Sequence, residues 1–281
     1  LAHAPWARAH RVVGLSPRRP RPPMGCAGSM GPDPHDAVLP DTVARDAGSL
    51  AKKVPFTKGS FDDFEFLGKL GQGANATVHL ARSSKSSGGA VAMKVTDLRE
   101  EGSLDWSEGR MSHLRLSAIE EEVQILTKVT GHPNVIEFMG SFRDSCLSCF
   151  VMEKCSCTLL QAIDRLPLIT ETTVRRILRE MLQGLAAVHH AGVVHRDVKP
   201  ENFMCAGDRD TVKLCDFGLA GVVTRSHPTL TGVLGTPPFM CPEMLNGKSY
   251  DTKADTWSFG VILYSLFYGR LPYEPEQRTS Q

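Results

Sequence analysis

The chain has 281 residues, which is enough for one large domain or two smaller ones, and its 41% hydrophobic and 22% charged residues are ordinary for a soluble globular protein. The net charge of +1 gives no overall electrostatic support for nucleic-acid binding, so we expect no nucleic-acid partner. No stretch approaches the roughly 20 consecutive apolar residues that a membrane-spanning helix requires.

Residues 1–60 lack sustained hydrophobic periodicity, are rich in proline and arginine, and are interpreted as a disordered tail. The stretch MGCAGS, which begins at Met24, fits the pattern for myristoylation of Gly25, and Cys26 could take a second acyl chain. Acylation would require Met24 to be the true start of the protein, and a chance match to a short pattern is the alternative. Eight cysteines without a secretory signal favour a reducing compartment, so we expect a cytoplasmic protein that meets a membrane only through acylation.

From Phe61 onward the hydrophobic pattern is that of a globular domain. It first predicts strands over 64–73, 76–83, 90–98, 134–142 and 148–154, with one helix over 117–129 that Ser117 and Glu120 would cap. After residue 158 the pattern is mostly helical. Residues 259–269 predict a buried helix, and residues 172–190 predict another whose apolar face holds Val174, Ile177, Leu178, Met181, Leu182, Leu185 and Val188. A small β-rich lobe followed by a larger α-rich lobe is therefore predicted.

The first predicted hairpin contains two glycines at its turn. Gly71 and Gly73 allow the backbone to bend sharply and to approach a phosphate group closely. A strand rather than a helix follows them, so a dinucleotide-binding motif is disfavoured. A simple hairpin without a ligand is the alternative.

Lys94 lies in the middle of an apolar strand, on the same face as Ala92, where an ammonium group needs an anion. Glu122 falls within the apolar stripe of the predicted helix, which Ile119, Val123, Leu126 and Val129 define, and a carboxylate there needs a cation. We therefore predict that Lys94 and Glu122 form an ion pair. The alternative is that both side chains reach solvent.

Residues 193–204, VVHRDVKPENFM, carry several polar side chains within an otherwise apolar run, which is costly unless they have partners. Asp197 can orient an attacking hydroxyl and accept its proton, Lys199 can neutralise a phosphoryl group, and Asn202 can offer a carbonyl oxygen to a metal. Asp216, in a strand-to-loop segment, is either a divalent-metal ligand or a capping residue. Magnesium bound with phosphates needs only one or two such protein ligands.

Taken in order, these segments resemble the eukaryotic protein kinases of the serine/threonine type over residues 61–281. The resemblance is carried by the glycine pair, Lys94, Glu122, HRDVKPEN at 195–202, Asp216-Phe217-Gly218, and Cys241-Pro242-Glu243. It implies an α+β, bilobal protein-kinase fold. The β-rich N-lobe would cover 61–152, and the hinge with a partial α-helical C-lobe, lacking the family's last helices, would cover 153–281.

The resemblance also implies ATP and Mg²⁺ as cofactors and phosphoryl transfer to serine or threonine hydroxyls of protein substrates. Lys94, held by Glu122, would bind the α- and β-phosphates under Gly71 and Gly73, and Asp197 would position the substrate hydroxyl. Lys199 is typical of the serine/threonine class. Asn202 and Asp216 would hold the metal, and the adenine would contact Leu70, Val78, Ala92, Met152, Glu153, Cys155 and Met204.

Regulation is implied by Arg196, which in the family faces a phosphate on the activation segment. Thr229 and Thr231 are the candidate sites for an upstream kinase, although Gly232 stands closest to the family's primary site, and unmodified threonines are the alternative. The sequence KPENFM at 199–204 favours a resemblance to the calcium/calmodulin-dependent group of the family. Asp255 would brace the loop that carries Asp197.

The chain departs from the family pattern in several places. Ala76 replaces a third glycine, Cys241 replaces an alanine, and a polar insertion at 99–113, predicted as a loop, separates Lys94 from Glu122. The chain ends at Gln281, so Glu243 would be a buried carboxylate without its arginine partner, and helices would expose apolar faces. A pseudokinase or a truncated scaffold is therefore the alternative function, and a zinc site is the alternative role for Cys146, Cys149, Cys155 and Cys157.

Overall fold

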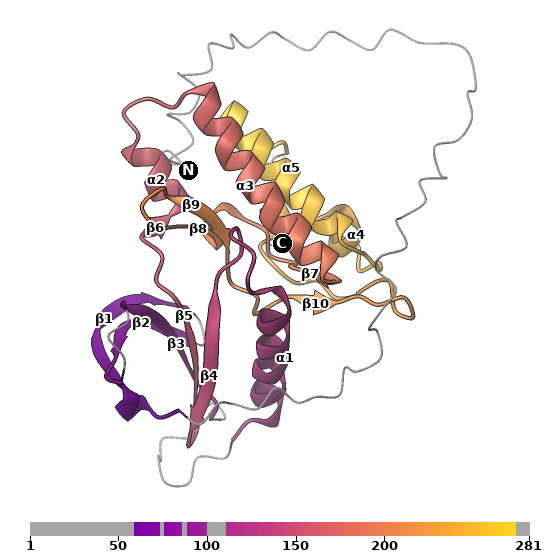
Figure 1. Ribbon diagram of the computed structural model, residues 1–281. Helices are drawn as coiled ribbons and strands as arrows, with labels where there is room; N and C mark the ends of the chain where they lie inside the picture. Colours follow the sequence, from indigo (N-terminus) through magenta and orange to yellow (C-terminus); the bar gives the residue numbers. More distant parts are fainter. Residues whose placement is uncertain (1–58, 74–75, 86–88, 100–110, 274–281) are drawn as a thin grey trace, which may run out of the picture.

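A five-stranded antiparallel sheet forms the N-terminal part of the computed structural model, which describes residues 59–73, 76–85, 89–99 and 111–273 (Figure 1). Its strands, in spatial order, are β1 (Phe64–Gln72), β2 (Ala76–Ser83), β3 (Val91–Asp97), β5 (Leu147–Glu153) and β4 (Phe138–Asp144). The tail over 1–58, with Gly25 and Cys26, lies outside the described residues, so acylation stays a prediction.

The predicted strand at 134–142 is wrong in its first four residues, because β4 begins only at Phe138. Asn134 and Ile136 pair instead with Leu214 at the end of β9 (Thr211–Leu214). Leu214 N donates to Asn134 O at 2.9 Å, and Ile136 N donates to Leu214 O at 2.9 Å. The segment therefore ties the sheet to the C-terminal part of the molecule.

Helix α1 (His113–Val129) lies beside the sheet and begins four residues earlier than predicted. Ser112 is its N-cap, with the side-chain oxygen accepting a hydrogen bond from Arg115 N at 3.4 Å, so the predicted cap by Ser117 and Glu120 is wrong. The predicted apolar stripe is confirmed, since Ile119, Val123, Leu126 and Val129 are all buried.

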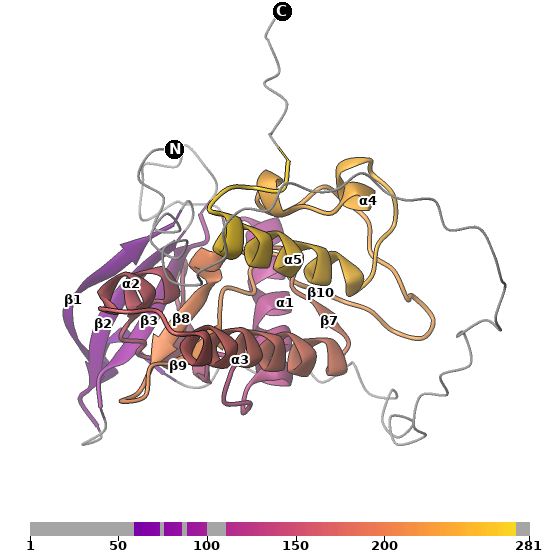
Figure 2. The same ribbon diagram turned by 90° about the horizontal axis from the view of Figure 1, so that it is seen from above.

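The C-terminal part is mostly helical, and Figures 1 and 2 both show its two long helices side by side. The helices are α2 (Leu159–Arg165), α3 (Glu171–His190), α4 (Pro242–Leu245) and α5 (Lys253–Tyr268), with 3-10 turns at Phe61–Asp63, Pro200–Asn202 and Pro237–Phe239. Two small sheets pair β7 (Val193–Val194) with β10 (Gly221–Val222), and β6 (Cys157–Thr158) with β8 (Phe203–Ala206) and β9. No helix in the described ranges combines the length and the apolar character that crossing a membrane requires.

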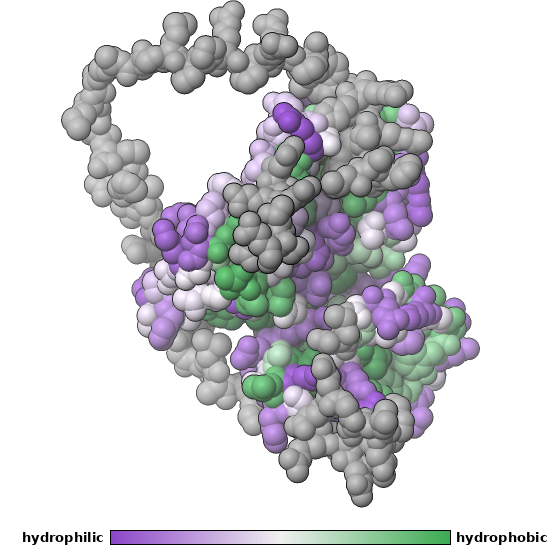
Figure 3. Space-filling model, turned by 180° about the vertical axis from the view of Figure 1, so that it is seen from behind, coloured by the Kyte–Doolittle hydropathy of each residue, from purple (hydrophilic) through white to green (hydrophobic). Residues whose placement is uncertain are grey.

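Helix α3 confirms most of the predicted apolar face, because Val174, Ile177, Met181, Leu185 and Val188 are buried. Leu182 is an exception, since 48% of it is exposed on the outer side of the helix. Large apolar side chains are also exposed on α4 and α5, among them Leu245, Trp257 and Tyr268. Figure 3 shows apolar patches between polar ones on the face that it draws.

Gly184 marks a close approach between α3 and the segment before β4. A Cβ atom at this position would overlap the main-chain oxygen of Asn134. Asn134 cannot withdraw easily, because its side-chain nitrogen donates to Val212 O at 2.9 Å and its oxygen accepts from Leu214 N.

We expect Gly184→Ala to lower the free energy of unfolding by about 2 kcal/mol, since the overlap outweighs the higher helix propensity of alanine. Gly260→Ala is the matched control, because a Cβ at Gly260 on α5 meets no atom within 4 Å. Urea denaturation should show the control unchanged or stabilised by up to about 1 kcal/mol. Stabilisation of the chain by both substitutions would contradict the close approach.

Candidate active site

Lys94 on β3 and Glu122 on α1 form the ion pair that the sequence predicts. Lys94 Nζ lies 2.7 Å from Glu122 Oε1, and both side chains are largely buried. The ring of Phe150, on the neighbouring strand β5, lies 5.9 Å from the same ammonium group. Burial alone would lower the pKa of Lys94, but the charges of Glu122 and Asp216 outweigh it and raise the pKa, so the ammonium stays charged.

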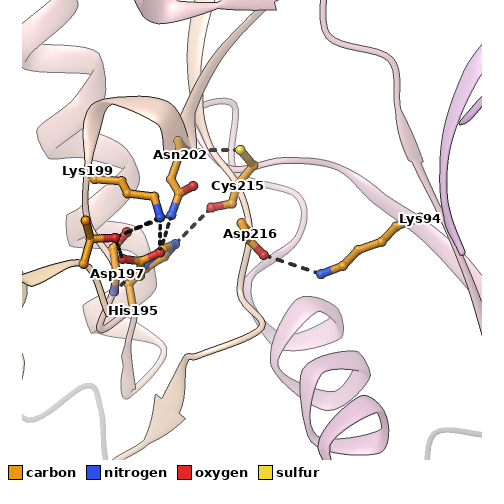
Figure 4. Close-up of polar contacts among 8 residues, drawn as sticks. Lys94, His195, Asp197, Lys199, Asn202, Cys215 and Asp216 are labelled. Carbon is orange, nitrogen blue, oxygen red and sulfur yellow. Dashed lines mark hydrogen bonds and ion pairs between the residues drawn. The ribbon is translucent and has the colours of Figure 1, made fainter. Parts of the chain in front are cut away.

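Asp216 brings a second carboxylate to Lys94. Its Oδ1 lies 3.4 Å from Lys94 Nζ, and Figure 4 shows this contact across the space between the two parts of the molecule. Burial opposes the ionisation of Asp216, but the nearby ammonium outweighs it and lowers the pKa of the carboxyl group. The residue has a left-handed backbone with φ of 63°, and about half of its side chain, 53%, is exposed. An ionised, half-exposed carboxylate of this kind can accept a cation.

Asp197 lies at the centre of a second polar cluster, drawn in Figure 4. Its Oδ2 lies 2.7 Å from Lys199 Nζ and its Oδ1 accepts a hydrogen bond from Thr236 Oγ1 at 2.7 Å. Lys199 Nζ also donates to Thr236 Oγ1 at 3.0 Å, so the three side chains close a ring of contacts. The Nδ2 of Asn202 donates to Asp197 O at 2.8 Å, which leaves its Oδ1 as an acceptor that can face a metal.

Asp255 of α5 fixes the loop that carries Asp197. Asp255 is only 1% exposed. Its carboxylate accepts hydrogen bonds from His195 N at 2.8 Å and Arg196 N at 2.9 Å, as the family resemblance implies. The ring of His189, at the end of α3, lies 2.7 Å from the same carboxylate. Sequence reasoning missed His189, since only the fold brings it within reach of Asp255.

Most of the residues predicted to contact adenine lie on the five-stranded sheet, and Met204 lies on β8 of the three-stranded sheet. Ala92 on β3 is opposite Met152 on β5, Val78 on β2 is opposite Lys94, and Met204 on β8 is opposite Thr158. Leu70 is exposed on β1. Their contacts with a nucleotide stay a prediction.

Two of the adenine-contact predictions fall at the end of β5 and just beyond it. The Glu153 side chain is already engaged, because its Oε1 lies 2.7 Å from Lys213 Nζ and accepts from Glu137 N at 2.7 Å. Its main-chain nitrogen donates to Glu137 O at 3.0 Å, so a nucleotide contact at Glu153 would use its main-chain oxygen. Burial raises the pKa of the Cys155 thiol, two residues on, to about 11, so this thiol is neutral near pH 7. Lys213, on β9, is a further residue that sequence reasoning missed.

The glycine turn and the polar insertion are described only in part. Gly73 N donates to Ala76 O at 2.8 Å and closes the turn, whose residues 74–75 lie outside the described ranges. Most of the predicted loop at 99–113 also lies outside them, over 100–110. On either side of 100–110, Arg99 and Met111 form a β-bridge. The predicted loop is wrong at its last residue, because α1 begins at His113.

The predicted activation segment, which follows Gly218 and carries Thr229 and Thr231, is held by contacts between its main chain and neighbouring residues. The guanidinium of Arg196 donates to Ala220 O at 3.0 Å and to Leu219 O, so the predicted phosphate-binding arginine is engaged by carbonyl groups. Thr229 and Thr231 are both exposed. The Tyr250 hydroxyl donates to the main-chain oxygens of Thr231 and Gly232, at 3.2 and 3.0 Å.

The structure does not support two of the expectations from the sequence, one for Glu243 and one for the cysteines. Glu243 is exposed rather than buried, because it lies on the outer side of the short helix α4, so the predicted unpaired buried carboxylate is wrong. The predicted zinc alternative gains no support, since no three His, Cys, Asp or Glu side chains within the described ranges are grouped to hold a metal ion. Burial raises the pKa of Cys149 to about 12, which is typical of a structural thiol.

Comparison with known proteins identifies the family. The sequence model described as "Protein kinase domain" matches residues 64–281. The CDPK-related protein kinase of Daucus carota is 32% identical over 277 residues, which cover 96% of this chain and 41% of that protein. Calcium-dependent protein kinase 27 of Oryza sativa subsp. japonica is 34% identical over 223 residues, covering 78% and 34% of the two chains.

Serine/threonine-protein kinase TIO of Arabidopsis thaliana is 32% identical over 212 residues, which cover 75% of this chain and 15% of that protein. The chain thus spans less than half the length of these three curated relatives. The matched region contains both polar clusters and the sheet, helices and loops that position them. Residues 64–281 belong to the protein kinase domain family, whose members use ATP.

Proposed function

We propose that this protein transfers the γ-phosphoryl group of ATP to serine or threonine hydroxyls of protein substrates. The observation that carries the proposal is the convergence of two clusters, Lys94 with Glu122 and Asp216, and Asp197 with Lys199 and Asn202 (Figure 4). The three named relatives are protein kinases, and the relative from Arabidopsis thaliana is named a serine/threonine-protein kinase, which supports the same reaction.

The donor set near Asp216 fits magnesium. An ionised carboxylate from Asp216 and the amide oxygen of Asn202 are hard oxygen ligands, and magnesium bound with phosphates needs few protein ligands. When bound, the ion would neutralise charge on the phosphate oxygens. Lys94 would bind the α- and β-phosphates, and its ion pair with Glu122 holds the ammonium in place for this.

The residues around Asp197 can direct the transfer itself. The substrate hydroxyl oxygen bonds to the γ-phosphorus while the bond from that phosphorus to the bridging oxygen breaks and ADP leaves. Asp197 would orient the hydroxyl and accept its proton, which then passes to solvent. Lys199, 2.7 Å from Asp197, would neutralise charge on the transferring group, and Thr236 holds the carboxylate in position.

Transfer of labelled phosphate from ATP to a generic basic protein tests the proposal, with Asp216→Asn as the matched control. We expect the wild-type chain to label serine and threonine residues, identified by mass spectrometry, and the control to label at least about 100-fold less. Equal labelling by both chains would contradict the proposal. Silence of the wild type, with magnesium and nucleotide bound, would favour the non-catalytic alternative.

An upstream kinase would act on Thr229 or Thr231. Both threonines are exposed in the activation segment, and an added phosphate can pair with a nearby arginine such as Arg196. We also infer a reducing, cytoplasmic location, which is supported by the free thiols of all the cysteines in the described ranges. Attachment to a membrane would depend on Gly25 and Cys26.

A further inference from the structure

Arg115, in the first turn of α1, contacts the chain just beyond the strand that carries Lys94. We propose that Arg115 is a positioning residue, which clamps α1 to the end of β3 so that Glu122 meets Lys94. The inference rests on the proposed function, because it assigns Arg115 a part in the same reaction.

The clamp consists of several hydrogen bonds between the end of β3 and the start of α1. The Nη1 of Arg115 donates to Asp97 O at 3.3 Å and to Arg99 O at 3.1 Å. Ser112 N donates to Leu98 O at 2.8 Å immediately before the helix. Hydrogen bonds from a charged donor are stronger than those between neutral groups, so the guanidinium contributes more to this junction than a neutral donor at the same position would.

Arg115 places a positive charge in the first turn of α1, where a helix favours negative charge. A cation in the first turn lies near the positive end of the helix dipole, where acidic residues are favoured, and the first turn of α1 contains no acidic residue. The main-chain oxygens of Asp97, the last residue of β3, and of Arg99 supply negative partial charge that the helix end does not. The contact with β3 therefore favours an arginine at a position where helix formation alone does not.

Two attachment points fix the orientation of α1 against β3. Arg115 and Glu122 are seven residues apart, which is close to two helical turns, so both face the same strand. On β3, Lys94 precedes Asp97 by three residues. At 1.5 Å per residue the two helical positions are about 10 Å apart, so a tilt of about 10° at Arg115 would move Glu122 by roughly 2 Å. Such a shift would break the 2.7 Å contact with Lys94.

The clamp joins the two residues that flank 100–110, the segment outside the described ranges. Leu98 and Arg99 contact Ser112, Met111 and Arg115 directly. These contacts tie the start of α1 to the end of β3 within the described ranges.

Steady-state kinetics of Arg115→Ala, alone and combined with Glu122→Gln, tests the proposal. We expect Arg115→Ala to lower kcat/KM about tenfold, which corresponds to about 1.4 kcal/mol. In the Glu122→Gln background the same substitution should change kcat/KM by less than about twofold, because the pair that it positions is already lost. Arg115→Lys should recover part of the activity, and Lys128→Ala, on the same helix, is the control for removal of a cation.

An equal loss in both backgrounds would show that Arg115 acts only on general stability, and a loss of less than about twofold in the wild-type background would also overturn the proposal. Hydrogen exchange of α1 peptides gives a readout that does not require activity. Arg115→Ala should speed exchange over 113–129 by about tenfold and leave α3 unchanged. If the wild type transfers no phosphate, the proposed function fails, while unchanged exchange in α1 would overturn the clamp alone.

Discussion

Lys94→Met should lower kcat for phosphate transfer by about 100- to 1000-fold, because it removes the ammonium that would stabilise charge on the phosphates. The fold should survive, since methionine fills the same space beside Phe150. Glu122 would lose its cation, and a buried carboxylate without a partner destabilises the chain unless it takes up a proton. Transfer assays and urea denaturation of the same preparation measure both effects.

The double variant Lys94→Met with Glu122→Gln separates these two effects. Its free energy of unfolding should return towards that of the wild type, because no buried carboxylate is left unpaired, while kcat should stay as low as in the single variant. Recovery of activity along with stability would show that Lys94 acts through folding. Wild-type activity in the single variant would refute the role assigned to the lysine.

Asp197→Asn should lower kcat by about 100- to 10,000-fold, the range that positioned acid–base groups contribute. The KM for ATP should change by less than about threefold, because Asp197 contacts Lys199, Thr236 and the Nδ2 of Asn202, and leaves the Oδ1 of Asn202 to face the metal. The amide is nearly the same size as the carboxylate and can still accept from Thr236. Initial rates at varied ATP and varied protein substrate measure the two parameters separately.

Asp251→Asn is the matched control for Asp197→Asn. Asp251 lies before α5 and its carboxylate is 3.6 Å from the exposed Lys253 Nζ, so this surface ion pair contributes little. The control should keep wild-type kcat. A kcat for Asp197→Asn within about threefold of the control would contradict the role of Asp197 as the residue that orients the hydroxyl.

The Lys94–Glu122 pair could be predicted from the sequence because both periodicities are local. Alternation along a strand places Lys94 on the face of Ala92, and the helical repeat places Glu122 in the apolar stripe of α1. Each of the two is a charged residue in an apolar setting and needs a partner of opposite charge, so each indicates the other as its partner. Burial of the stripe and the 2.7 Å contact confirm this reasoning.

Other features depend on contacts between distant segments and could not be predicted. The start of β4 is delayed because Leu214, far along the chain, takes the hydrogen bonds of Asn134 and Ile136. The strands β6, β7, β8 and β10 have two to four residues, too few to show a period. Leu182 fits the helical stripe but lies at its edge, where the described residues leave 48% of it exposed.

Binding of ATP to the wild-type chain, measured by isothermal titration calorimetry with and without Mg²⁺, tests most directly whether the two clusters form one nucleotide site. We expect Mg²⁺ to tighten binding by about tenfold or more, which is about 1.4 kcal/mol, since Asp216 and Asn202 hold the ion against the phosphates. In Asp216→Asn the gain should fall below about twofold. Absence of ATP binding, or an equal effect of Mg²⁺ in both chains, would contradict the account.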